Sequence, residues 1–421
     1  MIVGIIGSGG REHAICSKIK DSKKIEKIYC IPGNAGTAEI AENIEIDFND
    51  FYKIKDLVLS KKIDLLIVGP EKPLVEGIVD FLKGTNVKVF GPNKKASQLE
   101  GSKIFTKKLC QKYNIPTANF GIFQNEIESK KYLENSNYPI VIKADGLASG
   151  KGVYICKNKN EAFIAVEEIF NGKFGLADNL LIEEHLVGEE MSYFVITDGK
   201  TIKSFETAQD HKRVLEGDNG KNTGGMGAYS PSRLINLDLD KKIMEKIIKP
   251  TIKGLNEMKI EFSGFLYAGL MIKDNEPYLI EYNVRMGDPE CQTILPKLKT
   301  DLLEIILSCC DKVLDQIKIN WFKKKSICVV LCSAGYPDEY KKNIKIKNIN
   351  KIISNSNNLC FHAGTILSGN QVLSVGGRVL NFVSLSDNFL QARNEVIRNI
   401  KNLDWKDGFY RKDIGFKVIN Q

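Results

Sequence analysis

The sequence predicts an α/β protein in three parts, of which the first is a doubly wound parallel sheet and the last is β-rich. Three observations support this prediction. Over residues 1–100, short apolar runs alternate with segments of helical spacing. Strand patterns then enclose a glycine- and lysine-rich stretch at residues 141–153. After Trp321, strand patterns predominate again.

The first hundred residues contain four strand patterns, each of which runs into glycine or proline: MIVGIIG, KIYCIP, DLLIVGP and VKVFGP. Between them, segments such as FYKIKDLVLSKK and PLVEGIVDFLK have the spacing of helices. Ligands of doubly wound sheets bind beyond the carboxyl ends of the strands, which here read GSGGREHA, PGNAGT and GPEKPLV.

The first of these loops is not a dinucleotide-binding fingerprint. Glu12 stands where the pattern GxGxxG requires its third glycine, and no acidic residue closes the second strand at YCIPGN. A tight glycine loop that leads into a helix N-terminus, with Arg11 beside it, still suits a phosphate ester.

The next elements follow in order along the chain. Residues 101–117 have the pattern of a helix that leaves the first domain, and strand patterns return at YPIVIKA, GVYIC and NLLIEEHL. SYFVITDGKTIKSF predicts a hairpin that turns at Asp198 and Gly199, and residues 205–232 have the glycine-rich, polar composition of a functional loop region. DKKIMEKIIKPTIKGLNEM predicts an amphipathic helix. The remaining patterns are the strands FLYAGLMI, PYLIEYNV, SICVVLCSAG and SVGGRVLNFVSL and the helix NFLQARNEVIRNI.

Composition argues against membrane and nucleic-acid partners. The 421 residues allow two to four domains, and no run of 18 apolar residues could span a membrane. The N-terminus lacks the basic segment of a signal peptide, and ten scattered cysteines indicate free thiols in a reducing cytoplasm. The formal net charge is +8, but the lysines alternate with acidic residues and asparagine, which favours a solvated surface over nucleic-acid binding.

The arginines are few, and several lie near glycine or an acidic residue: Arg11, Arg213, Arg285, Arg378 and Arg411. A guanidinium group binds phosphate or carboxylate through two parallel hydrogen bonds. Contacts with an anionic ligand and structural salt bridges are both open interpretations of these positions.

The stretch VIKADGLASGKGV at residues 141–153 resembles a phosphate site, but it is not a Walker loop. The spacing from Gly146 to Gly150 is one residue too short, and Gly152 follows the lysine where serine or threonine belongs. Strand patterns on both sides predict a glycine-rich hairpin tip. Such a tip offers backbone N–H groups to phosphates, while Lys143 or Lys151 neutralises charge; a flexible turn is the alternative.

Three further groups of residues fit the same chemistry. Lys103 opens the helix before the hairpin, and LIEEHLVGEE at 181–190 places acidic residues at a strand end, where they would bind adenine and ribose or simply face solvent. In LIEYNVRMGDPE, Glu281 and Asn283 share one face of a strand, as metal ligands would. Their hard oxygen atoms suit Mg²⁺ on ATP phosphates, and Arg285 follows on that face, placed for a transferring phosphoryl group.

In this order, these features resemble the ATP-grasp superfamily. The strings GREHA, PGNAGT, VGPEKPLVEGIVD, QLEGSK, VIKADGLASGKGV, GFLYAGLMI, GDPE, FHAGT, GGRVL and RKDIG resemble the phosphoribosylamine–glycine ligase family within it. The string QDHKRVLEGDNGKNTGGMGAYSP is the most specific, and the resemblance runs from residue 1 to about residue 416. It implies an N-terminal domain at 1–101, a central ATP-grasp domain at 102–320 with a mobile nucleotide lid at 118–187, and a β-rich C-terminal domain at 321–421.

The resemblance implies an ATP-dependent, ADP-forming ligase that joins glycine to 5-phosphoribosylamine through glycyl phosphate in de novo purine biosynthesis. The implied protein is a cytoplasmic monomer that uses ATP with Mg²⁺ or Mn²⁺ and has no nucleic-acid or membrane partner. Another ATP-grasp carboxylate–amine ligase and a catalytically inactive nucleotide-binding regulator are the alternatives.

By similarity, the resemblance also assigns roles to individual residues. The ATP-binding residues would be Lys103, Lys143, Gly146, Ser149, Gly150, Lys151, Gly152, Glu183, Glu184, Leu186 and Glu190. The metal ligands would be Glu281 and Asn283, and the catalytic residues Arg285 and Asp288. The substrate-binding residues would be Gly9, Gly10, Arg11, Glu12, Asn34, Asp210, Lys212 and Gly287. The sequence departs from the family pattern at Ser149, His185, Tyr282 and Met286, and its YAGLMI strand carries no additional metal-binding aspartate.

Overall fold

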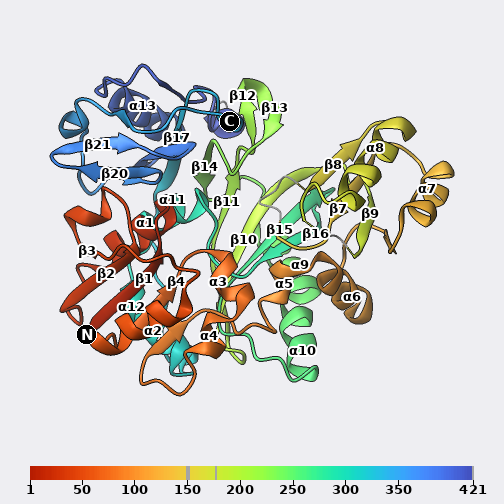
Figure 1. The fold of residues 1–421 in the computed structure, drawn as a ribbon, viewed down its shortest axis with the longest axis horizontal. Coiled ribbons are helices and arrows are strands. Elements are labelled where there is room, and N and C mark those ends of the chain that lie inside the picture. The colour runs from red at the N-terminus through yellow and green to blue at the C-terminus, as the bar shows by residue number, and fades with distance from the viewer. Residues whose placement is uncertain (148–151, 176–177, 420–421) are drawn as a thin grey trace.

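The N-terminal part of the chain folds into a parallel sheet whose first strand lies in the middle (Figure 1). The computed structural model describes residues 1–147, 152–175 and 178–419. The strand order is β3-β2-β1-β4-β5, and each neighbouring pair is parallel. The strands are β1 (Ile2–Gly7), β2 (Lys27–Pro32), β3 (Glu42–Asn43), β4 (Leu65–Val68) and β5 (Lys88–Phe90). The chain therefore winds outward in both directions from β1, which confirms the predicted doubly wound sheet.

Short helices cover this sheet and lead out of it. They are α1 (Gly10–Ile19), α2 (Phe51–Ser60), α3 (Glu71–Glu76), α4 (Ile78–Phe81), α5 (Gln98–Gly101) and α6 (Lys103–Tyr113), with a 3₁₀ turn at Thr37–Glu39. Most of α1 is buried, because it packs against the N-terminal sheet on one side and against β19 and α11 of later parts on the other. This helix therefore ties the first part of the chain to the last.

A separate antiparallel sheet projects to the right in Figure 1, and we call it the lid sheet. It consists of β6 (Phe120–Phe123), β7 (Ile140–Ala144), β8 (Val153–Cys156) and β9 (Leu180–Glu184), in the order β6-β9-β7-β8. Helices α7 (Glu126–Glu134) and α8 (Lys159–Phe170) pack on it around a hydrophobic cluster of its own. Strands β7 and β8 form the expected hairpin, in which Lys143 pairs with Val153.

The central and C-terminal parts share one large antiparallel sheet. Its order is β16-β15-β10-β11-β14-β17-β22-β19, and β23 adds to β17. The strands are β10 (Glu189–Thr197), β11 (Ile202–Asp210), β14 (Gly227–Ser230), β15 (Gly264–Lys273), β16 (Glu276–Asn283), β17 (Lys325–Ser333), β19 (Asn358–His362), β22 (Arg378–Ser386) and β23 (Gly408–Phe409). Strand β14 pairs with β11 on one side and with β17 on the other, so it joins the two parts. The hairpin predicted at Asp198 and Gly199 connects β10 to β11.

The helices of these later parts cover the large sheet. They are α9 (Leu237–Ile243), α10 (Lys249–Glu257), α11 (Glu290–Ile294), α12 (Leu302–Cys310), α13 (Phe389–Ile400) and α14 (Phe416–Ile419). The single amphipathic helix expected at 240–258 is instead α9 and α10 joined by a π turn at Met244–Ile248. Pro250 lies directly after the π turn, and because its ring carries no N–H group, the continuous helical segment lacks one backbone hydrogen bond there.

Two small sheets and a few 3₁₀ turns complete the fold. The small sheets contain β12 (Arg213–Leu215) and β13 (Asn219–Asn222), and β18 (Ile344–Lys345), β20 (Thr365–Ser368) and β21 (Gln371–Ser374). The 3₁₀ turns are Glu216–Asp218, Leu295–Lys297, Leu314–Gln316 and Ile349–Lys351.

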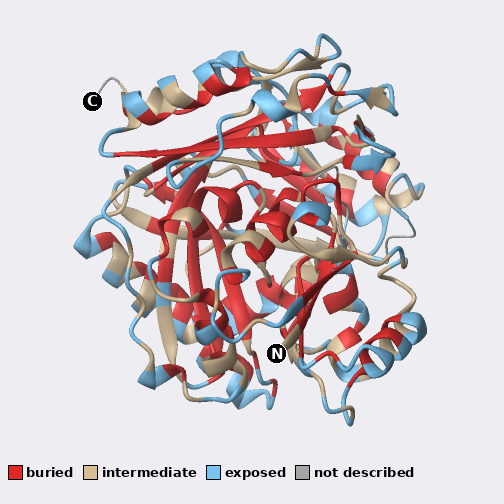
Figure 2. Cartoon of the chain, turned by 90° about the vertical axis from the view of Figure 1, so that its left-hand side faces the viewer, coloured by how far each residue is buried: buried red, intermediate tan, exposed pale blue. Residues whose placement is uncertain are grey.

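Figure 2 shows that buried residues concentrate in the inner strands and helices. All ten cysteines are free thiols, and within the described ranges no helix has the length and apolarity to cross a membrane.

Two buried histidines connect the N-terminal part to the C-terminal part. The backbone N–H of His362 donates to Nδ1 of His13 over 2.9 Å, and the His13 ring packs edge-on against Phe361. Burial lowers the pKa of His13 to about 3, and the nearby His362 and Lys20 add to this effect. Burial lowers the pKa of His362 to about 4. Both imidazoles are therefore neutral in the folded protein at neutral pH.

This junction predicts a loss of stability in mild acid. Unfolding returns each histidine to its ordinary pKa near 6.5, so below that pH the unfolded state binds more protons than the folded state. The free energy of unfolding therefore falls as the pH is lowered. Each histidine contributes at most about 1.4 kcal/mol per pH unit. The double variant His13→Asn/His362→Asn keeps a polar atom near each Nδ1 and cannot titrate. Urea unfolding at pH 7 and pH 5 should show a smaller acid loss in this variant than in the parent. Equal losses of unfolding free energy in the variant and the parent would show that these two histidines do not cause the sensitivity to acid.

Candidate functional site

The tip of the β7–β8 hairpin is attached to the start of α6. Lys103 Nζ donates to the carbonyl of Gly146 over 2.8 Å. The Asp145 carboxylate accepts from Ser102 Oγ over 3.1 Å and from the backbone N–H of Ile104 over 3.3 Å. At the other side of the tip, the carbonyl of Gly152 accepts from Ala144 N. The predicted phosphate-contacting residues Ser149, Gly150 and Lys151 lie outside the described residues.

Lys143 lies beneath this tip in a buried charge network that the sequence interpretation had missed in part. Its Nζ is 2.6 Å from one carboxylate oxygen of Glu183, and Lys107 Nζ is 2.9 Å from the other. Burial raises the pKa of Glu183, but the two ammonium groups outweigh burial and leave this pKa below its usual value. Lys107 was not predicted, although it lies one turn of α6 beyond Lys103 and therefore on the same face.

The end of β9 and the start of β10 carry the residues predicted for adenine and ribose. Glu184 is exposed and accepts from the backbone N–H of Asn119 over 3.0 Å. Leu186 is half-buried in the connection between the strands. Glu190 is 2.6 Å from Lys212 Nζ, with about half of its side chain exposed. Glu183 is therefore buried between two lysines, whereas Glu184, Leu186 and Glu190 remain at least partly exposed.

Glu281 and Asn283 lie two residues apart on β16, where Glu281 is opposite Gly269 of β15 and Asn283 is opposite Tyr267. Both side chains are half-buried. Within the described part of the chain, the Glu281 carboxylate forms no hydrogen bond or salt bridge with a side chain. Burial lowers the pKa of Lys103, and the charge of Glu281 opposes this shift. Because they lie two residues apart on one strand, the two side chains share one face of β16, as predicted.

A divalent ion would therefore find two adjacent oxygen donors here. No group of three or more His, Cys, Asp or Glu side chains with metal-site geometry occurs among the residues with described positions. Mg²⁺ and similar ions in nucleotide sites take one or two protein ligands and complete their shell with phosphate oxygens and water. An uncommitted carboxylate beside an amide oxygen fits that donor set.

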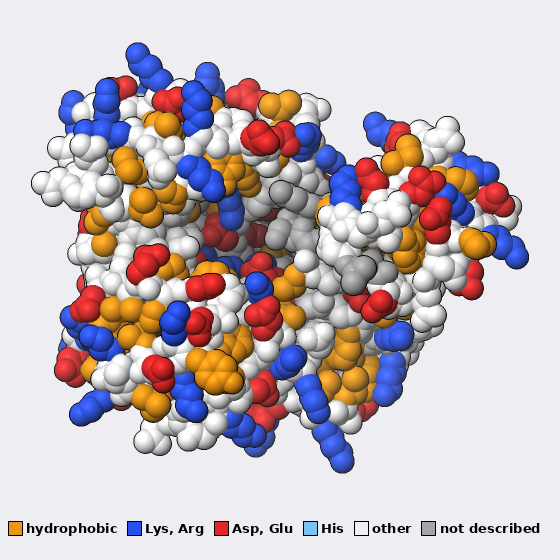
Figure 3. All heavy atoms as spheres, in the orientation of Figure 1, with side chains coloured by type: hydrophobic (Ala, Val, Ile, Leu, Met, Phe, Trp, Pro, Cys, Tyr) orange, Lys and Arg blue, Asp and Glu red, His pale blue; other side chains and the backbone are white. Residues whose placement is uncertain are grey.

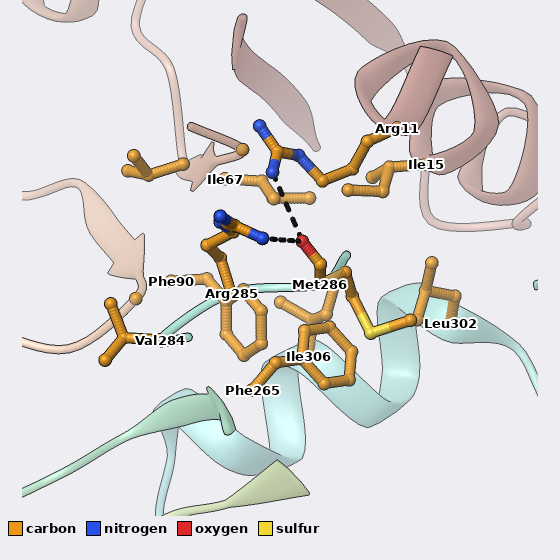
Figure 4. Close-up of a pocket in the computed structure, with 13 residues that line it drawn as sticks. Arg11, Ile15, Ile67, Phe90, Phe265, Val284, Arg285, Met286, Leu302 and Ile306 are labelled. Carbon is orange, nitrogen blue, oxygen red and sulfur yellow. Dashed lines mark hydrogen bonds between the residues drawn. The ribbon is translucent and has the colours of Figure 1, made fainter. Parts of the chain in front are cut away.

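Arg285 is held between the central and N-terminal parts (Figure 4). Its guanidinium donates to Glu100 over 2.7 Å and lies 3.3 Å from Glu71. Arg11 and Arg285 both donate to the carbonyl of Met286 over 3.2 Å, so two guanidinium groups point toward one oxygen atom (Figure 4). Burial raises the pKa of Glu100 to about 7, with Arg285 opposing the rise. The predicted contact of Arg285 with a phosphoryl group would require it to leave or share these carboxylates.

Asp288 joins three parts of the molecule. Its carboxylate accepts from Arg11 N over 3.2 Å and from Gln292 Nε2 over 2.7 Å. Arg378 of β22 lies 3.3 Å from the same carboxylate and also donates to the Asp288 carbonyl and to Gly224. Burial raises the pKa of Asp288, but Arg378 and Arg11 outweigh burial and hold this pKa below its ordinary value. Asp288 is therefore a charged residue that fixes the position of the loop carrying Gly287.

The predicted substrate residues of the first loop are largely engaged within the protein. Glu12 is buried; its carboxylate accepts from the backbone N–H of Gly9 over 2.7 Å and from Arg11 Nε over 2.6 Å. Asn34 is buried too, donating to the carbonyls of Ser8 and His362 and accepting from two backbone N–H groups of its own loop. A Cβ atom on Gly10 would lie 2.3 Å from Asn381 Nδ2, which explains that glycine by packing.

Asp210 and Lys212 line a small cavity together with Glu190, Met191, Ser192, Tyr267, Gly269 and Leu270. Burial raises the pKa of Asp210 well above its ordinary value, while Lys212 opposes the rise and Glu290 and Glu190 add to it. Figure 3 shows a hollow between the N-terminal part, the C-terminal part and the lid sheet, with acidic and basic side chains on its floor. Three of the predicted site residues, Glu190, Asp210 and Lys212, therefore line one polar cavity.

Three family models match consecutive parts of the chain, and each describes a domain of phosphoribosylglycinamide synthetase. The N domain matches residues 1–100, the ATP-grasp (A) domain residues 101–291, and the C domain residues 326–417. The chain belongs to the phosphoribosylglycinamide synthetase family.

Curated relatives of this family match over the whole length. A phosphoribosylamine–glycine ligase from Brucella melitensis is 44% identical, covering 100% of this chain and 99% of the relative. One from Caldanaerobacter subterraneus is also 44% identical and covers 98% of this chain and 99% of the relative. Both the N-terminal glycine loop and the C-terminal motifs therefore lie within the shared sequence.

Two solved structures share the fold of this chain, one from the same family and one from a biotin carboxylase. The crystal structure of the phosphoribosylamine–glycine ligase from Thermotoga maritima has a TM-score of 0.86 at 31% identity, covering 99% of this chain and 100% of that one. The biotin carboxylase domain of a Hydrogenobacter thermophilus 2-oxoglutarate carboxylase has a TM-score of 0.74 at 14% identity, covering 97% and 91%. The latter likeness shows a shared ATP-grasp fold and no more.

Proposed function

We propose that the chain uses ATP to join glycine to 5-phosphoribosylamine, giving glycinamide ribonucleotide, ADP and phosphate in de novo purine biosynthesis. The carrying observation is that Glu190, Asp210 and Lys212 line one small polar cavity, and that the charge of Glu281 acts on both Lys212 and Lys103. The relatives named phosphoribosylamine–glycine ligase support this assignment over the full chain.

ATP would bind between the lid sheet and the large sheet. Lys103 and Lys143 would contact its phosphates, and the hairpin tip from Gly146 to Gly152 would cover them with backbone N–H groups. Glu183, Glu184 and Leu186 would form the adenine pocket, and Glu190 would bind the ribose. Closure of the tip would exclude water from a reactive acyl phosphate.

The divalent ion, Mg²⁺ or Mn²⁺, would be held by Glu281 and Asn283. When bound, the ion would neutralise charge on the ATP phosphate oxygens. Glu281 has no competing partner side chain among the residues with described positions, so ligation breaks no interaction. Arg285 would contact the transferring phosphoryl group. To do so, it would have to leave or share its present partners Glu71 and Glu100.

The reaction would proceed through glycyl phosphate, because a free carboxylate is a poor electrophile. A carboxylate oxygen of glycine attacks the γ-phosphorus, and the bond to the β-phosphate oxygen breaks, which releases ADP. The neutral amine of phosphoribosylamine then attacks the acyl carbon. The carbon–oxygen bond to phosphate breaks, and one proton leaves with formation of the amide.

The two substrates would approach ATP from different sides. Glycine would bind near Asp210, Lys212, Gly287 and Asp288, and phosphoribosylamine near the loop of Gly9, Gly10 and Arg11. Glu12 and Asn34 would act there by holding the loop, since their side chains are already hydrogen-bonded. We further propose that the domains span 1–101, 102–320 with a lid at 118–187, and 321–421, and that the protein works as a cytoplasmic monomer.

The proposed activity is tested by ADP release. The chain with ATP, Mg²⁺, glycine and freshly prepared phosphoribosylamine should release ADP, and omission of either substrate should abolish steady turnover. A panel with D-alanine and bicarbonate in place of glycine separates this ligase from other ATP-grasp enzymes. ADP release that is indifferent to glycine, or faster with another carboxylate, would refute the proposal.

A further inference from the structure

The β12–β13 hairpin, at residues 213–222, belongs to the central part of the chain but is held by the C-terminal part. Arg411 Nη1 donates to the carbonyl of Arg213 over 2.9 Å, and the backbone N–H of Gly217 donates to Asp413 over 2.8 Å. Figure 1 shows the hairpin beside the C-terminus. The hairpin lies between β11 and β14 in the chain, so the C-terminal part holds a segment that leads directly out of the large sheet.

Arg411 is the centre of this attachment, and only 1% of it is exposed. Its guanidinium donates to both carboxylate oxygens of Asp413, over 2.8 and 2.6 Å, and to Asp218 over 2.9 Å. Arg411 belongs to the string RKDIG, and Asp218 belongs to the string QDHKRVLEGDNGKNTGGMGAYSP. Arg411 therefore forms structural salt bridges, one of the two interpretations open from the sequence, and these bridges join two distant motifs.

His211 connects this attachment to the candidate site. It is 1% exposed, the backbone N–H of Gly415 donates to its Nε2 over 3.1 Å, and its Nδ1 lies 3.4 Å from Asp218. A backbone N–H can only donate, so Nε2 carries no proton and the proton of the neutral ring lies on Nδ1, facing Asp218. Burial lowers the pKa of His211, and the hydrogen bond with Asp218 opposes this shift. The ring is therefore neutral at neutral pH, as the contact with Gly415 requires.

Lys212 follows His211 and projects to the opposite side of the chain. Asp210 and Lys212 line the polar cavity, and because side chains of an extended chain alternate, His211 faces away from it. The carbonyl of Lys212 accepts from the backbone N–H of Thr223 over 2.8 Å, and Lys212 Nζ lies 2.6 Å from the Glu190 carboxylate. The backbone that carries Lys212 is therefore fixed by contacts on the side remote from the cavity.

The contact at His211 forms only when the C-terminal part is in place, since Gly415 lies 204 positions further along the chain. A lysine side chain has several rotatable bonds, so a fixed backbone is needed to hold its ammonium group at one point in a cavity. A shift of about 1 Å in one reacting group can slow catalysis about 100-fold. The position of Lys212 thus depends on residues that lie outside the cavity.

We propose that the segment Arg411–Gly415 is a positioning element of the site, which acts through His211 to hold Lys212 toward Glu190 and the bound substrates. This inference rests on the proposed function, and it assigns a role in that reaction to residues that touch no substrate. Docking of the C-terminal segment completes the site of the central part. Displacement of this segment leaves Lys212 without a fixed backbone.

The test compares two substitutions of His211 by ADP release at varied glycine concentration. Gln can place an amide oxygen close to the position of Nε2 and accept from Gly415, whereas Leu offers no acceptor. His211→Leu should lower kcat/KM for glycine about 10- to 30-fold, and His211→Gln less than about threefold. Arg398→Met is the control and should match the parent, because Arg398 is an exposed arginine of the C-terminal part that pairs with Glu395.

A second comparison separates positioning from general stabilisation. Lys212→Met removes the group that His211 positions, so adding His211→Leu to it should lower kcat/KM by less than about threefold further. A histidine that only stabilises the fold would cause the same fold-loss in both backgrounds. Equal losses in both backgrounds would overturn the inference, and so would an unchanged kcat/KM with a lowered melting temperature in His211→Leu. Where Lys212→Met has no measurable turnover, the comparison of Gln with Leu decides alone, and equal activities of these two variants contradict the inference.

A milder variant covers the case in which His211→Leu does not fold. Asp413→Asn weakens the contacts with Arg411 and Gly217 and should lower kcat/KM for glycine about 3- to 10-fold. An unchanged kcat/KM in folded Asp413→Asn would then count against the inference. Absence of glycine-dependent ADP release in the parent would instead refute the proposed function itself.

Discussion

Glu281→Gln is expected to lower kcat/KM by about two to three orders of magnitude while leaving the fold intact. The substitution keeps the shape of the side chain but removes the charge that would hold the divalent ion. Because Glu281 forms no side-chain hydrogen bond or salt bridge in the described structure, its loss should hardly affect folding. Excess Mg²⁺ should restore only part of the activity, since a neutral amide oxygen is a weaker ligand.

Two measurements on one preparation decide this point. Mn²⁺ binding in the presence of ATP, followed by the loss of its free-ion magnetic resonance signal, should weaken clearly in Glu281→Gln. Glu276→Gln is the matched control, because Glu276 lies on the same strand but pairs with the surface lysines Lys242 and Lys246. Normal Mn²⁺ binding with a lowered melting temperature would show that Glu281 is a structural residue instead.

Lys143→Met should weaken ATP binding by about 10- to 100-fold, the equivalent of one lost charge-assisted contact of about 1.5–3 kcal/mol. Lys143 is the next-to-last residue of strand β7, close before the hairpin tip, where it would meet phosphate oxygens. Its removal leaves Glu183 paired with Lys107, so no uncompensated charge is buried.

Lys107→Met supplies the comparison. It leaves Glu183 paired with Lys143, but Lys107 donates to Thr117, lies 5.5 Å from the centre of the Phe120 ring and, within the described residues, forms no hydrogen bond with the tip. Nucleotide titration should therefore show nearly parental ATP affinity for Lys107→Met, with any effect appearing in thermal unfolding. Equal losses of ATP affinity in both variants would mean that the network as a whole, and not Lys143 itself, supports the nucleotide.

Much of the fold is predictable from the sequence because it depends on local patterns. The apolar runs of the first hundred residues and the alternation in LIEYN require only neighbouring residues to be interpreted. The hairpin at Asp198 is similarly local: its side chain accepts from the backbone N–H groups of Lys200 and Thr201. The family resemblance extended these local predictions to a three-part architecture.

Other features depend on residues far apart in the chain, so no local pattern reveals them. Asn34 is predicted to bind substrate, and no local pattern reveals that it also donates to the carbonyl of His362 and so helps to join two parts of the protein. The pairing of β14 with β17 places a strand of the glycine-rich loop region inside a sheet shared with the C-terminal part. Lys107 has a local signal, its spacing from Lys103 on α6, but its partner Glu183 lies far along the chain on β9.

The central claim is that this site forms glycyl phosphate before the amide. Glycine labelled with heavy oxygen in its carboxylate, together with ATP and phosphoribosylamine, tests this claim directly by mass analysis of the released phosphate. The account predicts phosphate that carries one labelled oxygen per turnover, in step with amide formation, because the attacking carboxylate oxygen stays with phosphorus. Unlabelled phosphate, with all of the label kept in the amide product or lost to water, would contradict it.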